Sequence, residues 1–462
     1  MNEISEYLAQ WMPRQRWYAG KTRAPRFENV GGFRLETKEP ATITVHFVLD
    51  HAEHPLLYQV PLTERRSPLV GAEHALIAVR DDGHGPVWVY DAPHDPAFAG
   101  ALLSLILDEG KVLATDGSHG VVAYGCRDLL NIGAAVASSR VLSGEQSNTS
   151  IVYDLTTVDG KPSTPVICKL FRALHDGPNP DVVLTTALGA AGSSVAPRAI
   201  GHLTAQWPDS GKLHGVATGH LAFAQEFLTG VEDAWRFALR AIEAGEDFSD
   251  RAHALGRTTA AMHRTLAGVL PTHATTPADV STAIASMRHR FELAAQQVPS
   301  LASYRDAIEE TYLRARSSPW PPMQRIHGDF HLGQVLAVPG RGWVILDFEG
   351  EPLRPMQERA LPDIPLRDVA GMLRSFDYVA GSFALAHGER SAGTWASDAR
   401  TAFLEGYVFG TGRELREHRA VLDAFEIDKA LYEAVYEASN RPNWLSIPIN
   451  AITRLLDGVV LS

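Results

Sequence analysis

The sequence has few cysteines, no long apolar run and no N-terminal leader pattern. Two cysteines, Cys126 and Cys168, cannot build a disulfide framework or a cysteine-rich zinc site, and two free thiols in a reducing compartment are the simpler interpretation. No stretch approaches the roughly 18 apolar residues of a membrane span. Residues 1–17 are polar and lack the apolar centre of a signal peptide. We therefore expect a soluble, cytoplasmic protein without a membrane partner.

Basic residues are also scarce relative to acidic ones. The chain has 42 Lys and Arg against 54 Asp and Glu, which gives a net charge of −12. A protein that wraps nucleic acid needs a basic footprint, so no nucleic-acid partner is expected. A site for one nucleotide needs only a few local charges and stays compatible with this balance. Hydrophobic residues make up 45% of the 462, which is ordinary for a globular protein of two or three domains.

Strand-like and helix-like segments are separated along the chain. Strand patterns predominate over the first 227 residues, at 42–50, 55–62, 74–80, 86–92, 121–125, 138–142, 150–155 and 165–171, with helices expected at 5–13 and over 95–110. Helical patterns follow at 232–245, 249–268, 277–291, around 304–312, 367–381, 397–410 and 424–440. Thr276 and Pro277 form a plausible helix start. This segregation predicts an α+β fold. We expect a β-rich cap at 1–90, an N-lobe at 91–228 and a helical C-lobe at 229–462.

One β-rich interruption of the helical part carries the clearest chemical pattern. Residues 326–334 read Ile-His-Gly-Asp-Phe-His-Leu-Gly-Gln, and an apolar strand then ends at Asp347. Phosphoryl transfer needs a carboxylate that takes the proton of the attacking hydroxyl, and oxygen ligands for Mg²⁺. We assign Asp329 as the catalytic carboxylate and Gln334 and Asp347 as metal ligands, because Gln334 follows Asp329 at the spacing of a kinase catalytic loop. The alternative is a hairpin with acidic turn residues.

Two upstream segments are candidates for holding ATP. The stretch 141–150 is rich in hydroxyls and amides that could cover phosphates, although such a stretch is also typical of a plain hairpin loop. Its candidate residues are Ser143, Gln146, Ser147, Asn148, Thr149 and Ser150. Lys169 lies in the middle of an apolar strand, where its charge needs a partner unless that face is solvated. Asp181 and Glu226 are the candidate partners, and neither is secure. Gln225, Glu226 and Phe227 end the β-rich part, where backbone groups would contact adenine; a buried strand without ligand contacts is the alternative.

Taken together, these residues resemble the protein-kinase-like superfamily of small-molecule phosphotransferases, and within it the actinobacterial maltokinases. The similarity rests on residues 15–21 (QRWYAGK), 143–150, 324–336, 345–352 (ILDFEGEP), 361–378 and 432–449. It implies a bilobal protein-kinase-like fold with a β-rich N-terminal cap. It also implies Mg²⁺ and ATP-dependent phosphorylation of maltose at its anomeric hydroxyl, in a route from trehalose to α-glucan. Trehalose synthase, which would supply maltose, is a candidate partner, and a monomer is expected. One departure is Val183, where an acidic residue would be expected.

The helix that ends at Asn440 predicts an acceptor site. Glu433, Glu437 and Asn440 share one helix face, and Trp444 follows after Pro442. Carboxylate, amide and indole groups suit sugar hydroxyls and the apolar face of a pyranose. The spacing alone favours the interpretation that these residues form a solvated charged face beside a core tryptophan. The resemblance to maltokinases instead favours a sugar-binding site. The acceptor candidates are His327, Arg374, Tyr436, Glu437, Asn440, Arg441 and Trp444, with Asp377 and Tyr378 as further members. For His327 a structural hydrogen-bonding role in its loop is the favoured alternative.

Two rival functions stay open on the sequence alone. A kinase for a cationic acceptor, such as glucosamine or an aminoglycoside, would need a dense acidic pocket. The acidic run Asp347-Phe348-Glu349-Gly350-Glu351 is compatible with such a pocket. A catalytically inactive, nucleotide-binding scaffold is the second rival. The intact Asp329, Gln334 and Asp347 argue against that scaffold.

Overall fold

The computed structural model divides the chain into two compact units, each described here by itself. Unit 1 comprises residues 1–186 and 197–229, and unit 2 comprises residues 187–196 and 230–462. The structure describes residues 3–21, 23–51, 55–114, 122–128, 135–142, 147–209, 215–351, 354–388 and 392–460. The change from unit 1 to unit 2 at residue 229 lies one residue from the boundary expected from the sequence. The segment 187–196, which the sequence analysis assigned to the N-lobe, belongs to unit 2.

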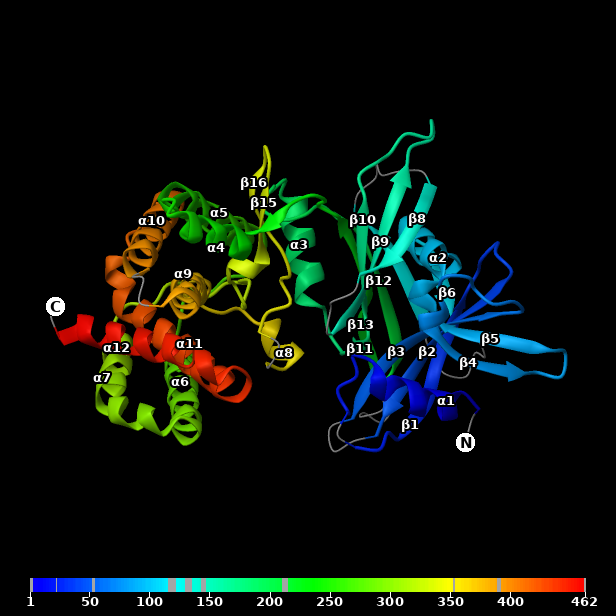
Figure 1. Ribbon diagram of the computed structural model, residues 1–462, viewed down its shortest axis with the longest axis horizontal. Helices are drawn as coiled ribbons and strands as arrows, with labels where there is room; N and C mark the ends of the chain where they lie inside the picture. Colours follow the sequence, from blue (N-terminus) through cyan, green and yellow to red (C-terminus); the bar gives the residue numbers. More distant parts are fainter. Residues whose placement is uncertain are drawn as a thin grey trace. The chain divides into compact units, whose positions relative to one another are not determined.

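Unit 1 begins with a helix and an antiparallel sheet formed mainly by the first 91 residues (Figure 1). The sheet order is β1-β2-β3-β5-β4, and β11 pairs with β3. The elements are α1 (Glu3–Trp11), β1 (Phe27–Leu35), β2 (Ala41–Asp50), β3 (Leu56–Arg65), β4 (Leu76–Asp81), β5 (Pro86–Asp91) and β11 (Ala173–Leu174). The strand-like runs at 42–50, 55–62, 74–80 and 86–92, each bounded by Pro, Gly or Asp, thus predicted β2 to β5 correctly, whereas β1 and β11 were not expected.

A second antiparallel sheet in unit 1 has the order β6-β7-β12-β13-β10-β9-β8 among the described residues. Its strands are β6 (Lys111–Leu113), β7 (Val122–Arg127), β8 (Ala135–Val141), β9 (Asn148–Thr156), β10 (Val166–Phe171), β12 (Ala199–Pro208) and β13 (Val216–Glu226). Helix α2 (Pro96–Leu107) begins at the N-cap Asp95. Helix α3 (Pro180–Ala190) begins in unit 1 after β11. Cys126 and Cys168 in this sheet are both free thiols.

The two sheets of unit 1 share one hydrophobic core. Phe33 and Phe47 of the first sheet lie in the same buried cluster as Ile151 and Leu170 of the second, together with the apolar face of α2. The ring of Phe47 meets that of Trp207 edge-on, with centroids 5.8 Å apart. The first 90 residues are therefore joined to the following sheet by continuous packing, which contributes stability in proportion to the apolar area removed from water.

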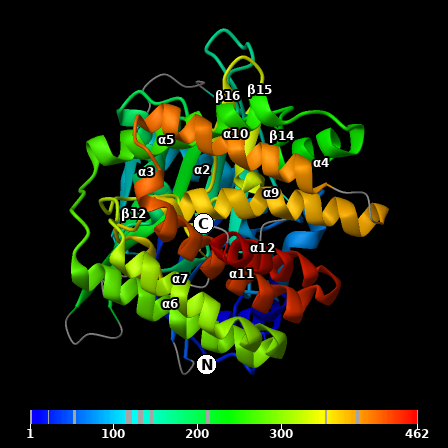
Figure 2. The same cartoon turned by 90° about the vertical axis from the view of Figure 1, so that its left-hand side faces the viewer.

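Unit 2 is mostly helical and contains one small sheet. Its helices are α4 (Ala234–Ala244), α5 (Ser249–Val269), α6 (Pro277–Gln297), α7 (Arg305–Ser317), α8 (Met356–Arg359), α9 (Leu366–His387), α10 (Gly393–Thr411), α11 (Arg419–Asn440) and α12 (Ser446–Val460). The sheet order is β14-β15-β16, from Glu232–Asp233, Val335–Val338 and Gly342–Ile345. Helices α5 and α10 lie side by side (Figure 2). None of the described helices has the length and apolar character needed to cross a membrane.

Local sequence rules explain several helix boundaries in unit 2. Helix α6 starts with the expected cap: Thr276 accepts a hydrogen bond from the backbone of Asp279, and the Asp279 carboxylate bonds back to Thr276. The close contact of α5 with α10 depends on glycine, because a Cβ on Gly256 would come 2.1 Å from the carbonyl oxygen of Phe403. The sequence analysis missed α12, although buried Ile447, Ala451 and Leu455 have helical spacing.

Candidate active site

The loop that carries Asp329 is held in a specific conformation by its own residues. Gly328 has φ +86°, a left-handed value that favours glycine, and a Cβ there would lie 3.2 Å from the Cα of Gly350. The buried ring of His327 accepts the backbone N–H of Asp329 at Nδ1 (3.3 Å) and bonds through Nε2 to the carbonyl of Leu346 (2.8 Å). In this structure both ring nitrogens of His327 therefore support the loop.

Helix α9 braces the same loop from one of its faces. Asp368, Gly371 and Ser375 lie three and four residues apart, so they share that face. The Asp368 carboxylate accepts the backbone N–H groups of His327 and Gly328, each at 2.8 Å, and Ser375 Oγ accepts the N–H of Leu332 at 3.1 Å. Gly371 is required because a Cβ would come 2.5 Å from the carbonyl oxygen of Phe330. These contacts from α9 thus hold the loop in one conformation.

The charge on Asp368 is stabilised inside the protein. Burial by itself raises the pKa of this carboxyl, but the hydrogen bond from His263 Nε2 (3.0 Å) and the loop N–H donors outweigh burial and hold the pKa below its usual value. Asp368 is therefore an anion that anchors the Asp329 loop. The sequence analysis did not single it out, although an acid surrounded by apolar residues in the first turn of a helix is an informative signal.

Asp329 itself projects into a cavity of unit 2. Its carboxylate accepts a hydrogen bond from Lys429 Nζ at 3.2 Å, and both side chains are about one quarter exposed. Phe330, Glu351 and Tyr432 contribute to the walls of this cavity. A partly exposed carboxylate on a braced loop beside a cavity has the placement that a general base for a hydroxyl acceptor needs.

Gln334 and Asp347 are brought together by the hairpin β15–β16. The Gln334 amide donates to the Asp347 carboxylate at 3.1 Å, and Leu346 N–H bonds to the carbonyl of Gln334. Asp347 has φ +61°, a left-handed conformation that non-glycine residues adopt rarely and that clusters at functional sites. Carboxylate and amide oxygens are the hard donors that Mg²⁺ prefers, so this pair fits a magnesium ion.

In unit 1, Lys169 pairs with Asp181. Lys169 Nζ lies 2.8 Å from the Asp181 carboxylate, and both side chains are buried. This pairing answers the question of the partner that the sequence left open, without an acid at Val183. The other candidate, Glu226, lies 3.3 Å from Arg198. A lysine held by a helix carboxylate on a central strand is the arrangement that kinases use to orient phosphates.

The other ATP candidates lie around Lys169 or at the end of β13. In the β9–β10 register, Ser150 is opposite Lys169 and Thr149 and Asn148 follow along the same strand, while Ser147 is exposed just before it. Gln225 is buried in β13 opposite Ile167, and Phe227 donates its backbone N–H to Pro165. Ser143 and Gln146 lie outside the described residues.

Thr149 is also tied to the first sheet through Arg172, a residue that the sequence analysis missed. The Arg172 side chain is fully buried and donates from Nε to Thr149 Oγ1 at 2.8 Å. Its Nη2 bonds both oxygens of Asp91 at 2.8–2.9 Å, and its guanidinium lies 4.8 Å from the ring centroid of Trp17. The cap segment is thus connected directly to the strand that borders the candidate nucleotide residues.

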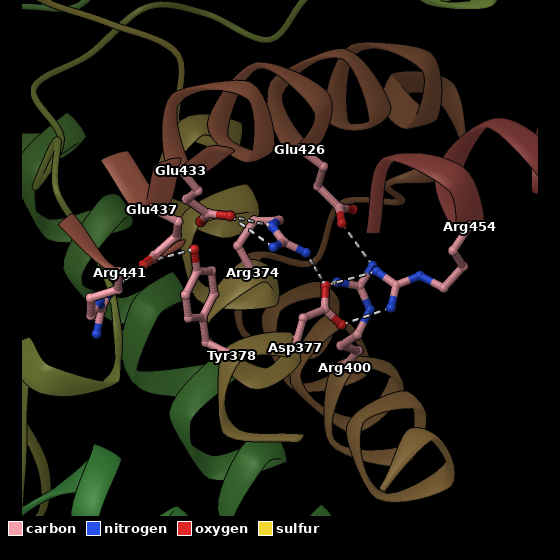
Figure 3. A network of polar contacts seen from close by, with 9 residues as sticks. All are labelled: Arg374, Asp377, Tyr378, Arg400, Glu426, Glu433, Glu437, Arg441 and Arg454. Carbon is pink, nitrogen blue, oxygen red and sulfur yellow. Dashed lines mark hydrogen bonds and ion pairs between the residues drawn. The ribbon is translucent and has the colours of Figure 1, made fainter. Parts of the chain in front are cut away.

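Two acceptor candidates, Glu437 of α11 and Arg441 just after it, form a connected polar group with Tyr378 of α9 (Figure 3). Glu437 is buried, accepts a hydrogen bond from Tyr378 Oη at 3.1 Å, and pairs with Arg441. The Arg441 guanidinium lies 4.4 Å from the ring centroid of Trp444. Asn440 is exposed and its amide bonds the carbonyl of Tyr436, which is also exposed.

Arg374 lies behind this group, fully buried. It donates hydrogen bonds to Glu433 at 2.7–2.9 Å and to Asp377. The Asp377 carboxylate also accepts hydrogen bonds from Arg400 and Arg454 (Figure 3). Burial raises the pKa of Glu433 despite the nearby Arg374 and Lys429 charges, whereas the surrounding arginines outweigh burial and lower that of Asp377. A direct sugar contact by Arg374 would require this network to open.

Comparisons with known families match most of the chain. Residues 141–420 match the model of the phosphotransferase enzyme family, and residues 11–95 match the maltokinase N-terminal cap domain. The range matched by the phosphotransferase family includes Lys169, Asp329 and Asp347, and the range matched by the cap domain includes Trp17 and Asp91.

Similar individual proteins carry the name glucosamine kinase. One from Mycolicibacterium smegmatis is 28% identical over 413 residues, covering 83% of this chain and 93% of its own. One from Streptacidiphilus jiangxiensis is 27% identical over 351 residues, covering 70% and 74%. A solved glucosamine kinase in complex with glucosamine, ADP and inorganic phosphate has a TM-score of 0.65 at 22% identity, covering 98% of this chain and 99% of that one. This likeness confirms the predicted fold.

Proposed function

Because the chain belongs to the phosphotransferase enzyme family, we propose that it transfers a phosphoryl group from ATP to the anomeric hydroxyl of maltose, giving maltose 1-phosphate and ADP. The match of residues 11–95 to the maltokinase cap carries the choice of maltose. The residues 361–378 and 432–449 that resemble maltokinases are also those that brace the Asp329 loop and form the polar group on α11.

In the proposed reaction, Asp329 orients the acceptor hydroxyl and takes its proton as the hydroxyl oxygen bonds to the γ-phosphorus of ATP and the bond from that phosphorus to the ADP oxygen breaks. Its braced loop keeps the carboxylate in place, which lowers the entropy lost on reaching the reactive geometry. Gln334 and Asp347 would hold Mg²⁺, which supplies charge neutralisation on the phosphates when bound. Lys169, oriented by Asp181, would contact the phosphates of ATP.

The charge pattern around the acceptor candidates supports a neutral sugar. Glu433 pairs with Arg374 and Glu437 pairs with Arg441. A cationic acceptor gains most from carboxylates that lack a basic partner, because those carboxylates do not have to give up an existing ion pair. Sugar hydroxyls can instead accept from the arginines and donate to the carboxylates of the same pairs.

Glucosamine is the second candidate acceptor, favoured by one specific finding. Two relatives that cover most of this chain, and a solved structure with the same fold, are named glucosamine kinases. Their names concern those proteins, at identities of 22–28%. A direct comparison of the two acceptors separates the candidates.

The test is an acceptor panel with the full-length protein. ADP release would be measured with ATP, Mg²⁺ and either maltose, glucosamine, glucose or trehalose, with Asp329→Asn as the matched control for background hydrolysis. We expect the highest kcat/KM with maltose, and a phosphorus NMR signal for an anomeric phosphate. A higher kcat/KM for glucosamine would overturn the proposal in favour of the second candidate. ADP release no greater than that of the control with every acceptor would favour a non-catalytic nucleotide-binding role.

A further inference from the structure

The cavity beside Asp329 has several charged groups in its wall. It is formed within unit 2 by the Asp329 loop, α9, α11 and residues from α6 and the segment after Asp347. Three basic side chains, Arg290, Arg367 and Lys429, line it, as do three acidic ones, Asp329, Glu351 and Asp428. The hydroxyl of an acceptor that reaches Asp329 would therefore lie beside charged side chains.

Two of the acidic groups already have arginine partners. Arg290 Nε lies 2.8 Å from Asp428, and its Nη1 lies 3.7 Å from Glu351. Arg367 lies 3.8 Å from the second oxygen of Asp428. These pairs are nearly neutral as units, so they act mainly as a polar wall and exert little net attraction on a distant charge.

Lys429 differs because its ion-pair partner is the candidate base. Its Nζ lies 3.2 Å from Asp329 Oδ1 and 5.0 Å from the ring centroid of Tyr432. Burial lowers the pKa of Lys429, but the carboxylates of Asp329, Glu351 and Glu433 outweigh burial and keep it above its ordinary value. The lysine is therefore an ammonium group at neutral pH, and it contacts the carboxylate that is proposed to receive the acceptor hydroxyl.

We propose that Lys429 is the residue that selects electrically neutral acceptors, by placing a fixed positive charge beside the carboxylate that binds the acceptor hydroxyl. This inference rests on the proposed role of Asp329 as the base. A hydroxyl can share Asp329 with Lys429, because a carboxylate accepts several hydrogen bonds. The ammonium group of an amino sugar is held close to the reacting hydroxyl by the small sugar ring, so it is repelled by Lys429 and cannot replace it.

Specificity of this kind arises from a repulsive element that acts against one class of ligand. Like charges a few ångström apart near a protein surface repel by an amount worth at least about tenfold in binding. Removing the lysine charge should therefore improve the acceptance of amino sugars relative to neutral sugars. Methionine is a suitable replacement because it is an unbranched side chain of similar length without a charge.

The experiment compares Lys429→Met with the unaltered protein, using maltose and glucosamine at a pH where the amine is protonated. The measured quantity is the ratio of kcat/KM for maltose to that for glucosamine. We expect this ratio to fall by at least about tenfold in Lys429→Met and to stay near its original value in Lys429→Arg, which keeps the charge. The KM for ATP should be similar in all three proteins. Lys429→Gln provides a second neutral variant if a thermal melt shows that the methionine variant is unfolded.

Arg419→Met is the matched control, because Arg419 lies on the same helix, is more than half exposed and pairs with Asp423. It removes one positive charge from α11 and should leave the ratio unchanged. A ratio that is unchanged in Lys429→Met and Lys429→Gln, or that falls equally in the Arg419 control, would overturn the role of Lys429. A preference of the unaltered protein for glucosamine would contradict the proposed function but not the role of Lys429. That role is tested by the change in the maltose-to-glucosamine ratio of kcat/KM between variant and parent, whichever sugar the parent prefers.

Discussion

Replacing Arg172 with methionine should destabilise unit 1 far more than the removal of an exposed charge does. The Arg172 side chain is fully buried, pairs with both oxygens of Asp91, donates to Thr149 and lies over Trp17. Removing one partner of a buried pair leaves the other charge without compensation and costs about 3–5 kcal/mol. That loss is a large share of the 5–15 kcal/mol by which a typical protein is stable.

The assay is urea unfolding of the full chain, followed by a signal from unit 1 such as the fluorescence of Trp17 and its neighbours. The matched control is Arg66→Met, because Arg66 pairs with Asp82 in the same unit but is more than half exposed. That exposed ion pair should contribute no more than about 1 kcal/mol to the free energy of unfolding. In the double variant Arg172→Met with Asp91→Leu, part of the loss should be recovered, since no buried charge is left unpaired.

Equal losses in the Arg172 and Arg66 variants would refute the reasoning, because burial would then make no difference to the value of the pair. No recovery in the double variant would also refute it, since the cost would come from lost packing volume and not from an uncompensated charge. The KM for ATP provides an additional readout. It should rise in Arg172→Met more than the KM for maltose, because Thr149 borders the candidate nucleotide residues.

Four further predictions test the site and its surroundings. Asp329→Asn should lower kcat by about 10²–10⁴-fold with little change in nucleotide affinity; a loss below tenfold in steady-state kinetics would contradict its role as the base. Asp347→Asn, which suits the left-handed backbone and removes only the charge, should raise the Mg²⁺ concentration needed for half-maximal rate; coincident metal titrations of variant and parent would exclude it as a ligand. Burial, with a smaller effect of His202, lowers the pKa of His220 to about 4, and its Nδ1 accepts the backbone N–H of Asn179. The unfolded chain therefore binds more protons between about pH 6.5 and 4, so stability should fall by about 2–4 kcal/mol as the pH is lowered through this window, and His220→Gln should flatten that pH dependence in urea titrations. Glu437→Ala should lower kcat/KM for maltose by about 10–100-fold without changing the KM for ATP, and unchanged maltose kinetics in a folded variant would move the acceptor site away from α11.

Local patterns of the sequence were sufficient for most elements and for the core of the proposed chemistry. Strand-like runs bounded by Pro, Gly and Asp predicted β2 and β5, and the Thr276–Pro277 start of α6 followed from capping rules. The association of Asp329, Gln334 and Asp347 with one hairpin could be predicted because these residues are close in the chain. Helix α12 was missed although its buried apolar residues have regular helical spacing.

The contacts that hold the site residues in place could not be predicted in this way, because the two residues of each contact are far apart in the chain. Asp368 anchors a loop 40 residues earlier, Lys429 reaches Asp329 across 100 residues, and Arg172 meets Asp91 across 81. A charged residue in an apolar helix or strand indicates that some partner exists, since an unpaired buried charge is too costly. It does not indicate which partner, because that depends on how the helices and strands pack.

The sequence by itself determined the kind of chemistry, through residue types at short spacing whose geometry is fixed by local backbone rules. The tertiary structure decided which groups are available for that chemistry. His327 has both ring nitrogens engaged within its loop, Arg374 lies buried among carboxylates, and Lys429 contacts the candidate base. The physical reason is that availability depends on burial and on long-range ion pairs, which form only when distant segments of one chain pack together.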